Sequence, residues 1–226
     1  MSFFENTRKP AGFGGKLMVV MMNLGHSPVA WWGLHFLELA PDDKVLDCGC
    51  GGGANIRRLL KKCPQGIVKG IDYSPVSVEK SKKVNETAIA DGRCAVLQGS
   101  VADMMFADNW FDAVTAFETV YFWPDLLQCF REVWRVLKPG GTFFICNESN
   151  GNTDKDEKWT KIINGMTIYK AFELNVGIRE APLTEQCLGA HDGLCTLPVV
   201  IRDLVIMGHA LVHLRKLAFH RSRCMV

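Results

Sequence analysis

The segment Lys44–Gly53 (KVLDCGCGGG) decides the fold of this chain. Its apolar residues predict a short strand that ends near the acid Asp47, and its glycines predict a tight turn, because glycine adopts positive φ angles and has no Cβ atom. The following residues, 54–62, place apolar side chains at helical spacing. A strand, a glycine turn and a helix in this order present free backbone N–H groups and the positive end of the helix dipole to a ligand. We therefore expect a ligand cradle at this turn.

A second acid, Asp72, follows the apolar run 67–71 and lies 19 residues after the last glycine of the turn. This is the spacing at which a βαβ unit presents a carboxylate to ribose hydroxyls. Two cofactor classes fit these features. One is S-adenosylmethionine, and the other is a nicotinamide dinucleotide, because Gly49, Gly51 and Ala54 also match the dinucleotide-binding fingerprint.

Asp47 distinguishes between the two cofactor classes. It lies two residues before Gly49, near the middle of the expected ligand, where a dinucleotide carries an anionic pyrophosphate that a carboxylate would repel. S-adenosylmethionine has no phosphate; it brings an ammonium and a sulfonium to this region, and its own carboxylate suits the helix N-terminus. We therefore expect S-adenosylmethionine as the cofactor, with S-adenosylhomocysteine as its product. An NAD(P)-dependent oxidoreductase remains the alternative enzyme class.

Two further motifs follow the glycine turn and Asp72: Phe111–Val114 (FDAV) and Leu137–Thr142 (LKPGGT). In this order, the four motifs resemble the class I S-adenosylmethionine-dependent methyltransferases over residues 41–148, with most similarity to the branch that includes quinone-biosynthesis enzymes. The resemblance implies an α/β fold, with a doubly wound, mostly parallel, Rossmann-like sheet. It also implies methyl transfer to a small-molecule acceptor by in-line displacement. A module that binds S-adenosylmethionine without catalysis is a further alternative.

The cofactor contacts follow from the matched motifs, with one departure. Ser100 stands where the family usually has an acid; its hydroxyl could accept a hydrogen bond from the adenine amino group, and the Val101 main chain could bond the ring. A plain loop serine is the alternative. The expected cofactor-binding residues are Asp47, Gly49, Cys50, Gly51, Asp72, Tyr73, Ser100, Val101 and Phe117.

Three residues are candidates for catalysis. Glu118 lies in the apolar and aromatic stretch 116–124, where burying an acid is costly without a purpose or a partner, so it is a candidate for acceptor binding or proton removal. Tyr121 could shape an aromatic pocket in the same stretch. His26 lies between two helical patterns and could act as a general base, because its usual pKa is near neutral. Each candidate also has a structural alternative: an ion pair for Glu118, core packing for Tyr121 and a helix cap for His26.

The rest of the chain predicts one domain in three parts. Residues 1–40 suggest a helical lid with glycine hinges and adaptable methionines, residues 41–150 the S-adenosylmethionine-binding core, and residues 151–226 a C-terminal substrate or cap segment. The expected strands are 44–47, 67–71, 94–98, 111–117 and 142–147, and the expected helices include 54–62, 75 to about 90, and one opened by Pro124.

The C-terminal segment lacks the hairpin signature usual for this family. Only residues 199–207 predict a strand there, so the strand at 142–147 would have an open edge, which predicts a homodimer. The histidines that crowd this segment, His191, His209, His213 and His220, have irregular spacing, and we expect no metal site.

Composition limits the partners. The formal net charge of +2 gives no broad basic face for nucleic acid, and the apolar runs 17–24 and 204–214 are too short to span a membrane, so neither partner is expected. Nine cysteines without a disulfide pattern, behind a charged N-terminus without a secretory signal, predict a reducing cytoplasmic location.

Overall fold

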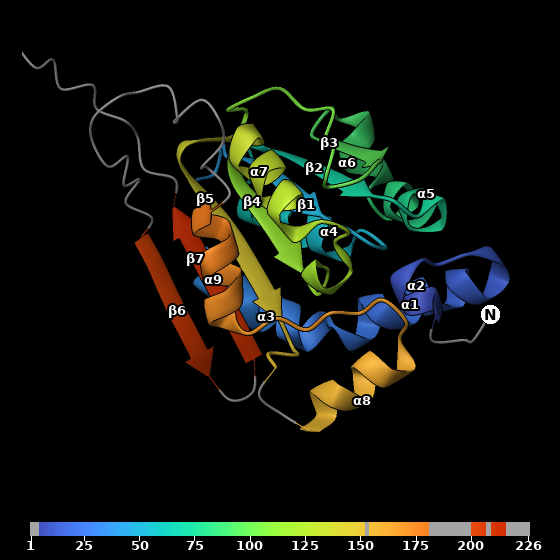
Figure 1. Cartoon of the computed structure of the whole chain (residues 1–226). Helices are drawn as coiled ribbons and strands as arrows, with labels where there is room; N and C mark the ends of the chain where they lie inside the picture. Colours follow the sequence, from blue (N-terminus) through green and yellow to red (C-terminus); the bar gives the residue numbers. More distant parts are fainter. Residues whose placement is uncertain (1–4, 152–153, 181–199, 207–208, 216–226) are drawn as a thin grey trace, which may run out of the picture.

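The computed structural model describes residues 5–151, 154–180, 200–206 and 209–215. These residues form a seven-stranded sheet with the strand order β3-β2-β1-β4-β5-β7-β6 (Figure 1). The first five strands in this order are parallel, and β7 runs antiparallel to both of its neighbours. The strands are β1 (Lys44–Cys48), β2 (Ile67–Asp72), β3 (Cys94–Gln98), β4 (Phe111–Phe117), β5 (Leu137–Asn147), β6 (Val200–Ile206) and β7 (His209–Arg215).

Helices cover both faces of the sheet, as the predicted doubly wound fold requires. They are α1 (Glu5–Arg8), α2 (Gly12–Gly25), α3 (Ser27–Phe36), α4 (Ala54–Lys62), α5 (Pro75–Val84), α6 (Glu86–Ala90), α7 (Leu126–Val136), α8 (Asp154–Ile162) and α9 (Ala171–Glu180), with a 3₁₀ turn at Val120–Phe122. α2 and α8 lie beyond the arrowhead ends of β4 and β5 (Figure 1).

The sheet separates two apolar cores because successive side chains of a strand point to opposite faces. On β5, Phe143 packs into the core beneath α7 and α9, whereas its neighbour Phe144 packs into the core with α3 and α4. α7 contributes Phe130 and Val133 to the first core. The five predicted strands are thus confirmed, and they bring the carboxyl ends of β1, β2 and β4 to one edge of the sheet.

The helix expected from residue 75 to about 90 is two helices. Its start is as predicted, since Ser74 accepts a hydrogen bond from the Ser77 N–H (3.3 Å) and Pro75 lies in the first turn. The helix is interrupted at the buried residue Asn85, whose Nδ2 donates to the Gly53 carbonyl (3.1 Å) and to the Ser81 carbonyl (2.9 Å). The break therefore ties this helix pair to the end of the glycine turn.

The expectation that the C-terminal hairpin is missing was wrong. β6 and β7 pair antiparallel from Val200 opposite Arg215 to Ile206 opposite His209, and β7 also pairs with β5. The misleading feature was the pair of histidines in residues 209–215 (HALVHLR). They lie four residues apart, so both fall on the same face of a strand, where side chains alternate with a period of two. β7 covers the edge of β5, so the open edge that predicted a homodimer does not exist. His191 and His220 lie outside the described residues.

Candidate functional site

A cavity of about 580 Å³ lies at the carboxyl ends of β1, β2 and β4. This is the edge at which open α/β sheets bind ligands. The floor of the cavity is the glycine turn after β1, together with Asp72 and the segment that follows β4. Residues of α2 and α8 close it from the other side, and His26 lies on its wall between α2 and α3. The structure therefore places the predicted lid and the predicted cradle around one space.

Two glycines in the turn have different roles. Gly49 has a φ of +69°, and a Cβ atom there would lie only 1.9 Å from Oγ1 of Thr119, so this position allows the segment after β4 to approach closely. Gly51 has a φ of +50°, but a Cβ atom there would meet no protein atom within 4 Å. Because Gly51 also lines the cavity, that open space is available to a ligand.

Asp72 lies at the end of β2 on the cavity wall, as its spacing predicted. Its two carboxylate oxygens accept the N–H groups of Ser74 and Gly51, each at 2.9 Å, and burial raises the pKa of the carboxyl. The bond from Gly51 links this acid directly to the glycine turn. Asp72 is therefore held where a carboxylate can accept the hydroxyls of a ribose.

Asp47 is almost completely buried, with 1% of its surface exposed, at the end of β1. One oxygen accepts a hydrogen bond from Oγ1 of Thr115 (2.9 Å), and the other has no hydrogen-bond partner among the described residues. Burial raises the pKa of Asp47 to about 7, which the bond from Thr115 opposes. Asp47 is not among the residues that line the cavity, so its binding of the cofactor stays a prediction, although a positive charge nearby would favour its ionised form.

Cys50, Tyr73 and Phe117 also line the cavity, and their contact with the cofactor stays a prediction. The hydroxyl of Tyr73 donates to the backbone carbonyl of Arg8, which joins the segment before α2 to the end of β2. Burial raises the pKa of the Cys50 thiol well above its usual range, and the nearby Asp72 and Asp47 raise it further. The thiol is therefore in its protonated, unreactive form.

Ser100 and Val101 are not among the residues that line the cavity. Ser100 is exposed, and its Oγ accepts the N–H of Ala102 (3.1 Å), which is the geometry of a local turn. Val101 is buried in the apolar core beneath α7. The loop-serine alternative accounts for this geometry, and a role for either residue in adenine binding stays a prediction.

Glu118 follows β4 in a strained conformation, with a φ of +56°. Its carboxyl accepts the N–H of Glu148 and lies 3.5 Å from the hydroxyl of Tyr121. That hydroxyl also donates to the carbonyl of Ser149 (3.1 Å) and accepts its N–H (2.9 Å). Burial raises the pKa of Glu118 to about 8 and that of Tyr121 well above its usual range, so both groups are mainly protonated at neutral pH.

His26 has the opposite protonation preference. Burial lowers its pKa from the usual value, and the more weakly acting carboxylate of Glu148 raises it. The imidazole forms no cap hydrogen bond with α3, although it stands at the N-terminus of that helix. His26 is therefore a neutral base on the cavity wall at physiological pH.

Part of the cavity wall comes from residues that were not among the predicted site residues. α8 and the residues after it contribute Trp159, Ile163 and Met166 to the cavity, and α4 contributes Asn55 and Arg58. Ile163 and Met166 lie after the end of α8, so helical spacing alone could not have placed them on this wall. On the opposite wall, α2 contributes Met18, Met21 and Met22.

Two hydrogen bonds join the predicted lid to the segments after β1 and β2. Nδ2 of Asn23 in α2 donates to the carbonyl of Gly52 (3.2 Å), and Oγ of Ser74 donates to the carbonyl of Pro10 (2.9 Å). A Cβ atom on Gly52 would overlap the side chains of Asn23 and Val19, so the helix packs directly on the turn backbone. α2 therefore forms a roof over the turn.

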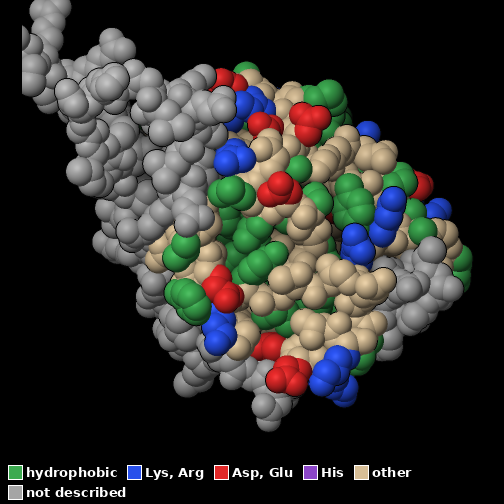
Figure 2. All heavy atoms as spheres, in the orientation of Figure 1, with side chains coloured by type: hydrophobic (Ala, Val, Ile, Leu, Met, Phe, Trp, Pro, Cys, Tyr) green, Lys and Arg blue, Asp and Glu red, His purple; other side chains and the backbone are tan. Residues whose placement is uncertain are grey.

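The remaining surface gives two negative findings. Acidic and basic side chains are interspersed over the described atoms of the face in Figure 2, without a continuous basic patch. Within the described residues, no helix is both long and apolar enough to cross a bilayer.

Comparisons with known proteins agree with this geometry. Residues 46–145 match the family described as "Methyltransferase domain". The cycloartenol-C-24-methyltransferase 1 of Oryza sativa subsp. japonica is 34% identical over 167 residues, which cover 69% of this chain and 45% of that protein. The chain spans less than half the length of the curated relatives it matches.

Solved structures show the same fold. An S-adenosylmethionine-dependent methyltransferase from Aquifex aeolicus has a TM-score of 0.69 at 18% identity, over 89% of this chain and 98% of that one. The geranyl diphosphate C-methyltransferase of Streptomyces coelicolor A3(2), in complex with S-adenosylhomocysteine, has a TM-score of 0.66 at 17% identity, over 92% and 86%. These matches favour S-adenosylmethionine over a nicotinamide dinucleotide as the cofactor, whereas the quinone-biosynthesis branch stays a prediction. Residues 46–145 of the chain therefore match the methyltransferase-domain family, and the chain has the fold of these enzymes.

Proposed function

We propose that this protein transfers the methyl group of S-adenosylmethionine to a carbon atom of an apolar isoprenoid acceptor, such as the alkene of a sterol side chain. The observation that carries the proposal is the set of apolar side chains that line the cavity from α2 and from α8 and the residues after it: Met18, Met21, Met22, Trp159, Ile163 and Met166. Flexible methionines and an aromatic ring accommodate a bulky hydrocarbon without offering it polar partners. The names of the relatives cited above, a cycloartenol and a geranyl diphosphate C-methyltransferase, support the same acceptor class.

The glycine-turn side of the cavity would hold the methyl donor. Asp72 would accept ribose hydroxyls, and the open space at Gly51 would admit the ligand close to the backbone. The unpartnered oxygen of Asp47 would favour the positive charges of the donor. When bound, S-adenosylmethionine supplies an electrophilic methyl group on a sulfonium with a neutral leaving group. The protein then needs chiefly to align the acceptor and to control its proton.

An alkene acceptor requires a base, because gaining a methyl cation leaves a positive charge on the acceptor that is resolved when a C–H proton departs. His26 is suited to accept that proton, since its lowered pKa keeps it neutral. Glu118 and Tyr121 are mainly protonated, so they would orient the acceptor and stabilise charge through their dipoles. We thus assign proton removal to His26 and acceptor positioning to Glu118 and Tyr121.

Calorimetry and single-turnover transfer would test the two halves of the proposal separately. S-adenosylhomocysteine should bind the wild-type protein, Asp72→Ala should weaken binding by at least about tenfold, and the exposed Asp91→Ala should not change it. Labelled methyl should then appear in cycloartenol or another isoprenoid alkene. Transfer to phenols or amines but not to alkenes would contradict the acceptor class, and unchanged binding by Asp72→Ala would contradict the donor site.

A reducing cytoplasm is the location that we propose for this activity, from the cysteine usage of the sequence. The cysteines at 48, 50, 63, 94, 129 and 146 are buried free thiols, which agrees with such a setting.

A further inference from the structure

The helix α2 is apolar on both of its faces. Gly15, Met18 and Val19 are buried against the rest of the protein, as expected for a packed helix. The opposite face is also apolar but is exposed, with 85% of Phe13 and 72% of Leu24 open to solvent. We call this face the outer stripe of α2; its members are Phe13, Leu17, Val20, Met21 and Leu24.

The spacing of the outer stripe makes it continuous. Its residues follow one another at intervals of four, three, one and three along the helix, so they share one side of α2. A helix that is apolar all round is normally covered all round, and a contiguous exposed apolar surface normally has a partner. The described residues of the chain leave this side of α2 uncovered.

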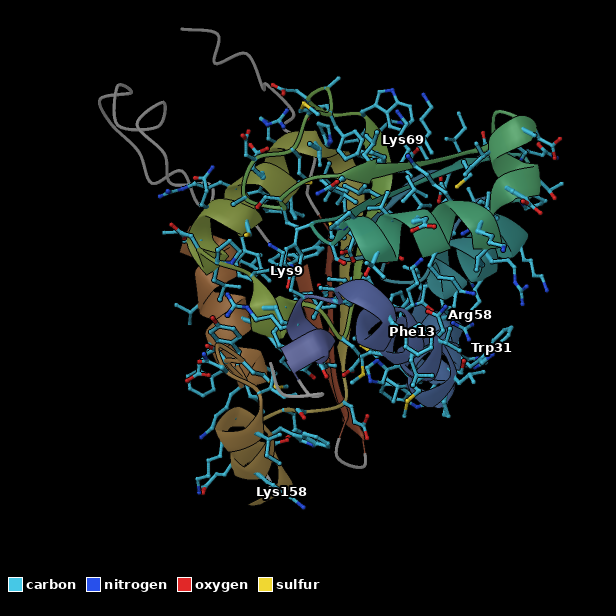
Figure 3. All side chains as sticks on the ribbon, turned by 90° about the vertical axis from the view of Figure 1, so that its right-hand side faces the viewer. Lys9, Phe13, Trp31, Arg58, Lys69 and Lys158 are labelled. Atoms are coloured by element: carbon cyan, nitrogen blue, oxygen red, sulfur yellow. The ribbon has the colours of Figure 1, made fainter. Side chains whose placement is uncertain are left out.

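Trp31 of the next helix, α3, extends the exposed apolar surface. It is 59% exposed, and the guanidinium of Arg58 lies 5.4 Å from the centre of its ring. Figure 3 shows Phe13, Trp31 and Arg58 on neighbouring elements at one side of the molecule. A tryptophan beside a cation is an arrangement suited to the boundary between water and lipid, because the ring is amphipathic and the guanidinium meets head groups.

The charge around the outer stripe is positive. Residues 6–37 contain no aspartate or glutamate, but they include Arg8, Lys9 and Lys16. Lys16 flanks the stripe on α2, and exposed Arg57 and half-buried Arg58 follow on α4. Lys16 forms an ion pair with the exposed Glu79, whose carboxylate lies 4.0 Å from Nζ of Lys16. A self-association through this face would bring like charges together, whereas an anionic surface would neutralise them.

We propose that the outer stripe of α2, with Trp31 and the flanking cations, docks the protein on an anionic lipid bilayer. The helix would lie in the plane of the interface with its apolar side chains among the acyl chains and its cations at the head groups. No helix crosses the bilayer in this arrangement. The proposal revises the sequence-based expectation that the protein has no membrane partner.

The outer stripe adjoins the cavity, so docking would affect how an apolar molecule reaches the cavity. Met21 belongs to the stripe and also lines the cavity, as does Arg58 of the flanking cations. Docking would therefore bring the α2 wall of the cavity to the lipid surface, and an apolar molecule dissolved in the bilayer would reach the site with little exposure to water. The docking itself does not depend on the acceptor, so its failure and the failure of the proposed function are distinguishable.

Vesicle sedimentation of the full chain, without donor or acceptor, tests the proposal. The protein should bind vesicles of phosphatidylcholine with phosphatidylserine more tightly than vesicles of phosphatidylcholine alone. Phe13→Ser combined with Leu24→Ser should weaken binding by at least about tenfold, because two apolar side chains no longer enter the lipid. Lys16→Gln should weaken binding to the anionic vesicles by about fivefold, with little effect on neutral ones.

A matched control removes equally exposed apolar side chains elsewhere. Met105 and Phe172 are 84% and 61% exposed and lie outside α2, so Met105→Ser combined with Phe172→Ser should bind vesicles like the wild type. Equal thermal unfolding of the two double variants would show that both are folded. Equal binding of vesicles by the two double variants would overturn the proposal. Wild-type protein that binds neither type of vesicle would also overturn it. A lipid-free dimer that the α2 variant abolishes would also overturn it, in favour of a second copy.

Discussion

The substitutions Gly49→Ala and Gly51→Ala separate the structural role of the glycine turn from its binding role. Both residues have positive φ angles, +69° and +50°, which cost an alanine about 1–2 kcal/mol each. At Gly49 the new Cβ would also lie 1.9 Å from Oγ1 of Thr119 and 2.7 Å from its Cβ, and such overpacking costs about 1–3 kcal/mol more. Gly49→Ala should therefore lower the free energy of unfolding by about 2–5 kcal/mol.

Gly51→Ala is the matched variant, because its Cβ would meet no protein atom within 4 Å. It should lower the free energy of unfolding by only the backbone cost of about 1–2 kcal/mol. Its methyl group would, however, occupy space on the cavity floor that a bound donor needs. We therefore expect Gly51→Ala to remain folded but to bind S-adenosylhomocysteine at least about tenfold more weakly, because overpacking of the bound state costs 1–3 kcal/mol.

Urea unfolding of the ligand-free proteins and calorimetric titration of S-adenosylhomocysteine would measure the two effects. Thr119→Ser offers an internal check at Gly49, since it keeps the hydroxyl that clashes and should rescue little stability. The reasoning would be refuted by equal stabilities of the two alanine variants. It would also be refuted if Gly51→Ala bound the ligand as tightly as the wild type, because the open space would then not belong to the donor.

Three further predictions follow from the site. The pKa of Asp47 is raised from 3.8 to about 7 in the folded protein, so the native state binds more protons than the unfolded chain between these values. The free energy of unfolding should therefore fall as pH rises from about 4 to about 7, and Asp47→Asn should make that slope shallower in denaturant titrations; the raised pKa of Glu118 accounts for part of the slope that remains, and an unchanged slope would contradict the assignment. His26→Gln should lower the rate of single-turnover transfer by at least about a hundredfold. Glu118→Gln mimics the protonated acid, so its rate should stay within about tenfold of the wild-type rate. The exposed His35→Gln is the control, and a larger loss in Glu118→Gln than in His26→Gln would reverse the assigned roles. Asn23→Ala should weaken the contact between α2 and the Gly52 carbonyl, at a cost of about 1 kcal/mol, and should speed release of S-adenosylhomocysteine in stopped-flow experiments. An unchanged release rate would mean that this contact does not hold the roof closed.

The sheet and the cradle could be predicted because their signals are local. The strand-turn-helix pattern at residues 44–62 and the position of Asp72 depend on backbone rules and on spacing along the chain. The structure confirms the five parallel strands and places Asp72 beside Gly51. Cys50 and Tyr73, which also line the cavity, belong to the glycine turn and to the position after Asp72.

The features that were missed depend on contacts between distant residues. The helix break at Asn85 exists because its side chain bonds the Gly53 carbonyl, 32 residues away in the sequence. The wall from Trp159 to Met166 depends on where α8 lies in space, which helical spacing does not reveal. The hairpin of β6 and β7 was obscured because two histidines interrupt an otherwise apolar strand, and only pairing with β5 resolves the pattern.

The protonated state of Cys50 has a consequence for an enzyme that handles an alkylating agent. Any thiolate on the wall of this cavity would compete with the proper acceptor, since sulfur anions are strong nucleophiles towards a sulfonium methyl. Burial and the two neighbouring acids keep the Cys50 sulfur as a thiol, so the turn has a small side chain at this point without exposing a nucleophile. In the proposed function, burial and these two acids would thereby also protect the protein from methylating itself.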